Sequence, residues 1–392
     1  MKNLRADTVL VHAGRRPFDN HGIVNPPVYH CSTVLFPTLD ALEERDRHPF
    51  EGVNYGRIGT PTSFAFEDAV AELEGGYRAV NAPSGLAAIT TALTAFTSKG
   101  DHILVADSVY GPTRRFCNET LSNYGVVVEY FDPRLSAADL AKLMRSQTRV
   151  VFLESPGSLT FEVQDVPALA KVAHDGGAVV LMDNTWGTPI GFRAFDHGVD
   201  VSIHAATKYI VGHADAMLGV MVCTKETFLP IKKTAVRLGT AAGPDDLYLG
   251  LRGLRTLSAR LRIHQENGLA LADYLARRHE VTRVLHPGRP GDPGHDIWKR
   301  DFHYACGLFA VTIRDVPRPA LTAMLDHLEL FGMGYSWGGF ESLILPVKPA
   351  AVRSATRWEE PGILLRLHAG LENIDDLIRD LDAGFDRMTK AL

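Results

Sequence analysis

Residues 148–183 read TRVVFLESPGSLTFEVQDVPALAKVAHDGGAVVLMD, and this stretch decides the fold. Two apolar runs, TRVVFLE and AVVLMD, flank VPALAKVAHD, in which apolar residues recur with helical spacing. The pattern predicts a strand, a helix and a second strand, the unit that places two parallel strands in one sheet. Both runs are apolar along most of their length, which is typical of strands covered on both faces.

The same alternation continues on both sides of this stretch. A helix is predicted at 85–96 and another at 136–144. Further strands are predicted at 78–82, 102–107, 126–131, 201–206 and 217–223. The sequence therefore predicts an α/β fold with a mostly parallel sheet between helices. Ligands of such sheets bind beyond the carboxyl ends of the strands, which is where candidate site residues are sought.

The length of 392 residues predicts two packed domains rather than one. Residues 1–60 are rich in Pro, Gly and His and form an irregular leader, which we expect to be an arm that contacts a neighbouring subunit. Residues 61–250 form the large domain, and 251–392 form a smaller C-terminal α/β domain. The smaller domain follows one helical stretch at 245–279, kinked at Gly253 and Gly268. Its other expected elements are strands at 307–313, 342–347 and 362–368 and helices at 320–328 and 373–390.

Composition excludes several classes of protein. The 41 basic residues are balanced by 46 acidic ones without a basic run, which argues against a nucleic-acid binder. No apolar segment reaches the length of a membrane helix, and no signal peptide is seen. The four cysteines lie far apart without a CxxC pair, and the histidines lack HExxH, so we expect no disulfide framework and no metal. These features predict a cytoplasmic protein that binds small molecules and copies of itself.

The stretch VSIHAATKYIVGHAD at 201–215 carries the first candidate residue, Lys208. It follows a predicted strand among apolar neighbours, and desolvation favours the neutral amine, the form that attacks an aldehyde. Asp183 ends AVVLMD at the same edge of the sheet, where a carboxylate suits the protonated pyridine nitrogen of pyridoxal phosphate. Taken alone, the position of Lys208 favours an ordinary surface lysine, and Asp183 equally suits an aspartate that caps the following turn.

Three other loops carry residues suited to a phosphorylated, planar cofactor. Ser84 and Gly85 join a predicted strand to a helix whose first N–H groups can bind phosphate, although Ser84 also suits a helix N-cap. Tyr110 follows the strand at 102–107, so its ring could stack on the cofactor or simply lie in a partly buried loop. Tyr55 and Arg57 offer a hydroxyl and a guanidinium to a phosphate, or form a solvated turn.

In this order the motifs resemble the Cys/Met-metabolism family of pyridoxal-phosphate enzymes, which includes cystathionine lyases and synthases, methionine γ-lyase and homoserine sulfhydrylases. The resemblance covers nearly the whole chain. Its motifs are TVLVHAG at 8–14, YGR at 55–57, SGLAA at 84–88, YGPT at 110–113, DNTW at 183–186 and ATKYIVGH at 206–213. It implies aminotransferase fold type I with a large cofactor-binding domain. It also implies a homo-oligomer, expected to be a tetramer formed as a dimer of dimers that share active sites.

The resemblance also implies roles for individual residues. Lys208 would hold the cofactor as a Schiff base and take the substrate α-proton, while Asp183 would pair with the pyridinium. Lys208, Tyr110 and Tyr55 are the candidates for passing a proton to the leaving sulfur. Tyr55 and Arg57 would come from a neighbouring subunit. The full implied cofactor-binding set is Tyr55, Arg57, Ser84, Gly85, Leu86, Tyr110, Asp183, Thr185, Thr207 and Lys208.

Within the family, FGMGYSWGGFESL at 331–343 resembles bacterial cystathionine β-lyases. Many γ-eliminating or γ-replacing relatives have an acidic residue in place of Tyr335 and a leucine in place of Trp337. The implied substrate-binding residues are Tyr335, Ser336, Trp337 and Arg366. Arg366 would grip the α-carboxylate in a bidentate pair, although a structural salt bridge also suits it. ESPGSL at 154–159 departs from the ESPxNP of many relatives.

The implied reaction is cleavage of cystathionine to homocysteine, pyruvate and ammonia. A γ-lyase, or a γ-replacement enzyme such as cystathionine γ-synthase or homoserine sulfhydrylase, is the nearer alternative. A serine hydrolase is the alternative from another class, because 334–338 matches GxSxG and Glu359 and His368 follow in the order of a triad. That elbow needs a preceding strand and a following helix, whereas a strand is predicted to follow here.

Overall fold

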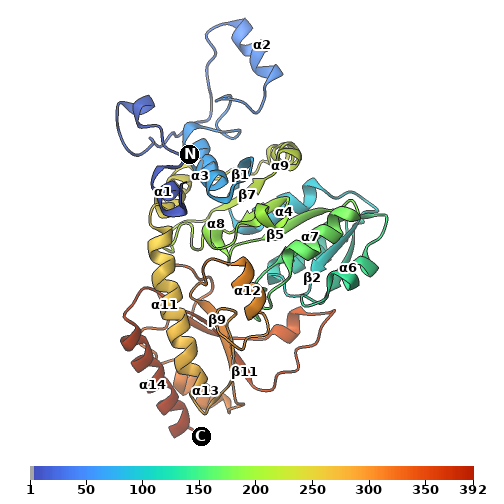
Figure 1. The fold of residues 1–392 in the computed structure, drawn as a ribbon. Coiled ribbons are helices and arrows are strands. Elements are labelled where there is room, and N and C mark those ends of the chain that lie inside the picture. Colours follow the sequence, from blue (N-terminus) through green and yellow to red (C-terminus); the bar gives the residue numbers. More distant parts are fainter. Residues whose placement is uncertain (1–3) are drawn as a thin grey trace.

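The computed structural model describes residues 4–392 and contains two sheets (Figure 1). The larger has seven strands in the order β1-β7-β6-β5-β4-β2-β3. Their bounds are β1 Arg78–Ala82, β2 His102–Ala106, β3 Val127–Phe131, β4 Thr148–Glu154, β5 Val179–Asp183, β6 Val201–His204 and β7 Gly219–Cys223. Strands β3, β2, β4, β5 and β6 run parallel to one another, and β7 pairs antiparallel with both β6 and β1. The predicted mostly parallel α/β sheet is confirmed.

Helices pack on this sheet because the predicted helical stretches bury one apolar side. Contacts to its strands come from α3, α4, α7 and α9. The bounds are α3 Pro61–Glu74, α4 Gly85–Ala95, α5 Gly111–Arg115, α6 Ala137–Leu143, α7 Val166–Asp175, α8 Thr188–Gly191 and α9 Lys225–Leu238. The inner strands are largely buried, with β2 and β7 buried along their whole length, whereas the edge strand β3 is partly exposed. This rigid layer ends at the edge where the candidate residues lie.

The second sheet has four antiparallel strands in the order β10-β11-β9-β8. Their bounds are β8 Val281–Leu285, β9 Leu308–Ile313, β10 Leu343–Val347 and β11 Ile363–His368. Helices α13 Arg318–Leu325 and α14 Ile374–Lys390 pack together beside it, and α12 His295–Asp301 faces the large sheet (Figure 1). The predicted strands and helices of the smaller α/β part are therefore present. The domain boundaries at residues 60 and 250 stay predictions.

The prediction of one helical stretch at 245–279 is wrong. It forms α10 Pro244–Leu254 and α11 Leu257–Ala276, with the break at 255–256. The Gly253 carbonyl at the end of α10 accepts from the Thr256 amide at 3.2 Å and from Arg260 Nη2 at 2.8 Å, so it is satisfied without a continuing helix. No kink occurs at Gly268, which lies inside α11. A Cβ there would stand 3.0 Å from the Cys306 carbonyl oxygen, so this glycine serves close packing.

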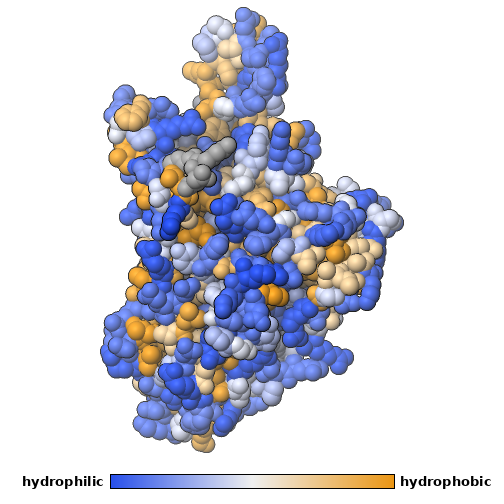
Figure 2. Space-filling view, in the orientation of Figure 1, coloured by the Kyte–Doolittle hydropathy of each residue, from blue (hydrophilic) through white to orange (hydrophobic). Residues whose placement is uncertain are grey.

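The leader within residues 4–60 contains α1 Ala6–His12 and α2 Leu39–Arg47, which were not predicted. Helix α1 packs on α3 and buries Val9 and Leu10. Helix α2 buries no residue and projects from the body of the molecule (Figure 1). Figure 2 shows apolar residues on the exposed leader, and Leu35 is 88% exposed.

Candidate active site

A cavity of about 450 Å³ lies at the carboxyl ends of β4, β5 and β6. Its walls contain every predicted site residue except Tyr55 and Arg57. Those wall residues are Ser84, Gly85, Leu86, Tyr110, Asp183, Thr185, Thr207, Lys208, Tyr335, Ser336, Trp337 and Arg366. The position agrees with the rule for open parallel sheets, since neighbouring strands bring their ends to one edge.

Lys208 follows β6 and points its amine into this cavity. Its Nζ donates to Ser336 Oγ at 2.6 Å and lies 5.6 Å from the centroid of the Trp337 ring. Burial and the nearby Arg366 charge lower the pKa of Lys208 to about 8, although Asp183 opposes this shift. A much larger share of neutral amine is therefore present near neutral pH than for a surface lysine.

Asp183 is the last residue of β5 and is only 8% exposed. Its Oδ1 accepts from the Thr185 amide at 3.0 Å and from Thr185 Oγ1 at 2.5 Å. Burial raises the pKa of Asp183, while the Thr185 hydrogen bonds, His204 and Lys208 oppose this rise. The turn-capping alternative is thus correct for Oδ1. Both contacts with Thr185 end on that atom, so Oδ2 remains available to the cavity.

The N-terminus of α4 forms another wall. Ser84 Oγ accepts from the Ala87 amide at 3.1 Å, so the N-cap alternative is confirmed. A Cβ on Gly85 would lie 2.4 Å from Ala205 Cβ, so only glycine permits this approach. Thr207 Oγ1 accepts from the Leu218 amide at 2.8 Å and donates to its carbonyl at 3.1 Å. The Thr207 contacts hold the loop before Lys208 to the segment before β7, and the approach of Gly85 to Ala205 places this loop beside the helix end, where free N–H groups attract a phosphate.

Tyr110 precedes α5 and is half exposed to the cavity. Its backbone N–H donates to Glu154 Oε2 at 2.7 Å. Burial raises the pKa of Tyr110, and Asp183 and Glu154 add to the rise while Arg366 opposes it. The phenol is therefore protonated near neutral pH and can donate a hydrogen bond.

Glu154 is a cavity residue that sequence reasoning missed. It ends β4 and is the register partner of Asp183 on β5, so two carboxylates lie side by side. Burial raises the pKa of Glu154 well above its ordinary value, and Asp183 adds to this rise. The signal was present, because Glu154 ends a buried strand just as Asp183 does.

The wall from the smaller sheet is formed by Arg366 and the loop it holds. Arg366 lies on β11, and its Nη2 donates to the carbonyl oxygens of Ser336 at 3.0 Å and Gly334 at 3.4 Å. No ion pair involving Arg366 is present within residues 4–392, so the salt-bridge alternative has no support there. Trp337 packs on Tyr209 with ring centroids 5.5 Å apart, and Tyr335 is 92% exposed.

The serine hydrolase alternative does not fit this geometry. Residues 334–338 form a loop that leads into β10 rather than into a helix. Ser336 Oγ accepts from Lys208, while His368 Nε2 accepts from the Gly338 amide at 3.0 Å. Glu359 lines a separate cleft. The strand, turn and helix that a nucleophile elbow requires are not found around Ser336.

Tyr55 and Arg57 lie outside the cavity of their own chain. Arg57 Nη1 donates to the Val236 carbonyl at 2.6 Å, near the end of α9. Tyr55 is 40% exposed, and its Oη accepts from Ser32 Oγ at 3.5 Å. Their predicted roles, which assigned them to a neighbouring subunit, stay predictions.

The cavity fits pyridoxal phosphate in three respects. Asp183 is a buried carboxylate with one oxygen available for a pyridine nitrogen. The end of α4 supplies amide donors for a phosphate, and Lys208 supplies an amine of lowered pKa for an aldehyde. No group of residues that could hold a metal ion, and no helix long and apolar enough to span a membrane, is found within 4–392.

Comparison with known proteins agrees with this fit. The family described as Cys/Met metabolism PLP-dependent enzyme matches residues 7–386. The chain is 48% identical to a putative cystathionine beta-lyase of Rhizobium johnstonii, with 98% of this chain and 97% of the relative covered. It is 44% identical to cystathionine beta-lyase MetC of Escherichia coli, with 99% and 100% covered. The solved structure of cystathionine gamma synthase from Xanthomonas oryzae pv. oryzae superposes over 100% of both chains, with a TM-score of 0.90 at 32% identity. The chain belongs to the Cys/Met metabolism family of PLP-dependent enzymes.

Proposed function

We propose that this enzyme is a carbon–sulfur β-lyase that cleaves cystathionine to homocysteine, pyruvate and ammonia. The observation that carries the proposal is the meeting of Lys208 and Arg366 at Ser336. Lys208 Nζ donates to Ser336 Oγ at 2.6 Å, and Arg366 donates to the Ser336 carbonyl at 3.0 Å. A base and a cation without a carboxylate partner thus share one wall, as the amine end and carboxylate of an amino acid require. Tyr335 and Trp337 lie on this wall at positions where many γ-eliminating or γ-replacing relatives have an acidic residue and a leucine.

The residues of the cavity divide the chemical work among them. Bound pyridoxal phosphate supplies an electron sink for the charge left on the substrate α-carbon. Asp183 keeps the pyridine nitrogen protonated, and Arg366 orients the α-carboxylate. Lys208 takes the α-proton, which its lowered pKa permits near neutral pH. Tyr110 and Lys208 line the cavity and can return a proton to the departing sulfur.

The proposal includes a homo-oligomer, expected to be a tetramer in the cytoplasm, in which the leader completes the site of a neighbouring copy. The body of one chain leaves Tyr55 and Arg57 outside its own cavity. Helix α2 buries no residue, and Phe18 and Leu35 are exposed on the same leader. A second copy of the chain would cover these side chains. The substrate is a sulfur-containing amino acid, with no nucleic acid or membrane as partner.

Product analysis tests the reaction. Purified enzyme loaded with pyridoxal phosphate is incubated with cystathionine, and pyruvate and 2-oxobutyrate are measured separately. β-Elimination gives pyruvate with homocysteine, whereas γ-elimination gives 2-oxobutyrate with cysteine. We expect pyruvate in excess, and no keto acid from the Lys208→Ala variant as control. Predominant 2-oxobutyrate, or product formed only when an acylated homoserine and a thiol are supplied, would overturn the β-lyase assignment.

A further inference from the structure

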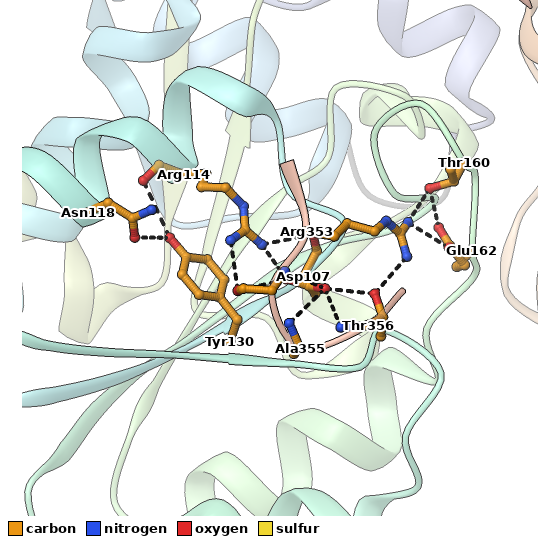
Figure 3. A network of polar contacts seen from close by, with 10 residues as sticks. Asp107, Arg114, Asn118, Tyr130, Thr160, Glu162, Arg353, Ala355 and Thr356 are labelled. Carbon is orange, nitrogen blue, oxygen red and sulfur yellow. Dashed lines mark hydrogen bonds and ion pairs between the residues drawn. The ribbon is translucent and has the colours of Figure 1, made fainter. Parts of the chain in front are cut away.

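The loop between β10 and β11 reaches across to the large sheet through Arg353–Thr356, a segment we call the strap. Figure 3 shows the strap between two partners. One is Asp107, at the end of β2, and the other is the turn at 157–162, which follows β4. Both partners belong to loops that line the cavity, since Tyr110 and residues 156–159 and 161 are among its walls.

Asp107 fixes the strap to the loop of Tyr110. Its carboxylate accepts from the amides of Ser354 at 3.0 Å, Ala355 at 3.1 Å and Thr356 at 2.8 Å, and from Thr356 Oγ1 at 2.7 Å (Figure 3). Arg114 donates to the same carboxylate. Burial opposes ionisation of Asp107, which is 1% exposed, but these hydrogen bonds outweigh it and lower its pKa. The charged carboxylate therefore holds three successive N–H groups, a strong arrangement.

Arg353 fixes the strap to the second loop. Its Nη2 donates to Thr160 Oγ1 and to Glu162 Oε1, the latter at 2.7 Å (Figure 3). Both Arg353 and Glu162 are largely buried, so the pair is shielded from solvent. Thr160 also donates to Glu162 Oε2 at 2.6 Å, which closes the group around one turn.

This turn has an unusual backbone. Leu159 and Phe161 have φ angles of +66° and +58°, in the left-handed region that residues other than glycine rarely adopt. Such conformations cost free energy and persist where the surroundings hold them. Arg353 donates hydrogen bonds to Thr160, which lies between these two residues, and to Glu162, which follows them. Arg353, from the loop between β10 and β11, is therefore placed to hold this turn.

We propose that Arg353 is a positioning residue that sets the cavity wall formed by Leu159 and Phe161, and thereby the fit of the substrate. Asp107 acts with it by fixing the strap beside Tyr110. The inference rests on the proposed lyase function, because the fit is measured with cystathionine. The wall is thus set by a residue of the loop between β10 and β11 that itself lies outside the cavity.

Arg353→Met tests this inference in the full-length holoenzyme. Loss of the guanidinium frees the turn, so hydrogen exchange measured by mass spectrometry should rise at 157–162 and stay unchanged in β5 and β6. kcat/KM for cystathionine should fall about tenfold or more, since small misplacements at a site carry large rate costs. The matched control is Arg357→Met, an exposed arginine of the same loop, which should change neither quantity. Arg353→Lys, which keeps the charge without the fork, should recover part of the loss.

Three results would overturn the inference: unchanged exchange at 157–162, raised exchange there with unchanged kcat/KM, or an equal effect of Arg357→Met. If Arg353→Met does not fold, Thr160→Val removes the contact of Arg353 with Thr160, together with the hydrogen bonds from the Thr160 hydroxyl to Glu162 and to the Ser158 carbonyl, and is judged by the same criteria. Failure of the proposed function is recognised separately. In that case the wild-type enzyme releases no pyruvate from cystathionine, while the exchange comparison still reports whether Arg353 holds the turn.

Discussion

The two halves of the predicted site behave differently in a single chain. Asp183 ends strand β5, Lys208 and Tyr110 follow strands β6 and β2, and the three residues meet in one cavity. Tyr55 and Arg57 come from the leader and lie outside that cavity. The first half therefore forms a cavity within a single chain, whereas Tyr55 and Arg57 do not reach the cavity of their own chain.

The difference follows from how each half is held. Main-chain pairing sets the strand ends, as the register of Glu154 with Asp183 shows, so the residues that follow arrive at fixed positions. The leader has no strand among residues 4–60, and its helix α2 buries nothing. A sheet edge can therefore be preorganised by one chain, whereas helix α2 of the leader is not held by burial within that chain.

The largest expected effect comes from replacing Lys208, which belongs to the half of the site at the strand ends. Lys208→Ala should lower lyase activity by at least about 10⁴-fold, because a general base alone contributes about 10² to 10⁴ and the covalent link to the cofactor is also lost. The visible absorption of the bound cofactor should change as well. Lys233→Ala, at an exposed lysine of α9, is the control and should behave as wild type. Substantial lyase activity in Lys208→Ala would remove this residue from the mechanism.

Much of the fold was predictable because a parallel sheet requires apolar strands that alternate along the sequence with helices. TRVVFLE at 148–154 and VPALAKVAHD at 166–175 agree with β4 and α7 to the residue. Prediction failed where tertiary contacts decide. Helix α9 carries Pro230 in its interior, which weakens its helical signal. At the break before α11, the side chain of Arg260 donates to the Gly253 carbonyl, a contact that the hydrophobic pattern does not reveal.

The site was predictable where a polar residue ends a buried strand, as Asp183 does. Glu154 follows the same rule, but it lies in ESPGSL at 154–159, where the difference from ESPxNP is the more conspicuous feature. Asp107 and Arg353 could not be found in this way. They lie 246 positions apart in the numbering, and only the folded chain shows that the strap joins them.

The next largest expected effect tests directly whether Arg57 acts in the cavity of a neighbouring subunit. Arg57→Met and Lys208→Ala are each expected to be nearly inactive alone. When the two are unfolded and refolded together, about one quarter of wild-type activity should return, because half of the two-fold dimers are hybrids with one intact site in two. Lyase activity of the mixture, compared with each variant refolded alone, is the measurement.

A matched mixture serves as the control. Lys208→Ala combined with Asp183→Asn should give no recovery, because both residues line the same cavity of one chain. Recovery in this control would mean that the cavity is itself shared between chains. No recovery with Arg57→Met would place Arg57 in the site of its own chain and would end the comparison between the two halves.

The smallest expected effect is on the pH dependence of Lys208, which belongs to the half of the site at the strand ends. In cofactor-free enzyme, the rate at which Lys208 combines with added pyridoxal phosphate should rise with pH through about 8, since the neutral amine attacks and the pKa of Lys208 is lowered to about 8. Burial is the larger cause and the Arg366 charge the next, so Arg366→Leu favours the protonated amine and should move the midpoint upward. The midpoint should stay below about 10.4, the ordinary lysine value, because the burial remains. Arg357→Leu should leave it unchanged. A midpoint that falls in Arg366→Leu would show that Arg366 does not set the charge of Lys208, and the two would then act on the substrate independently.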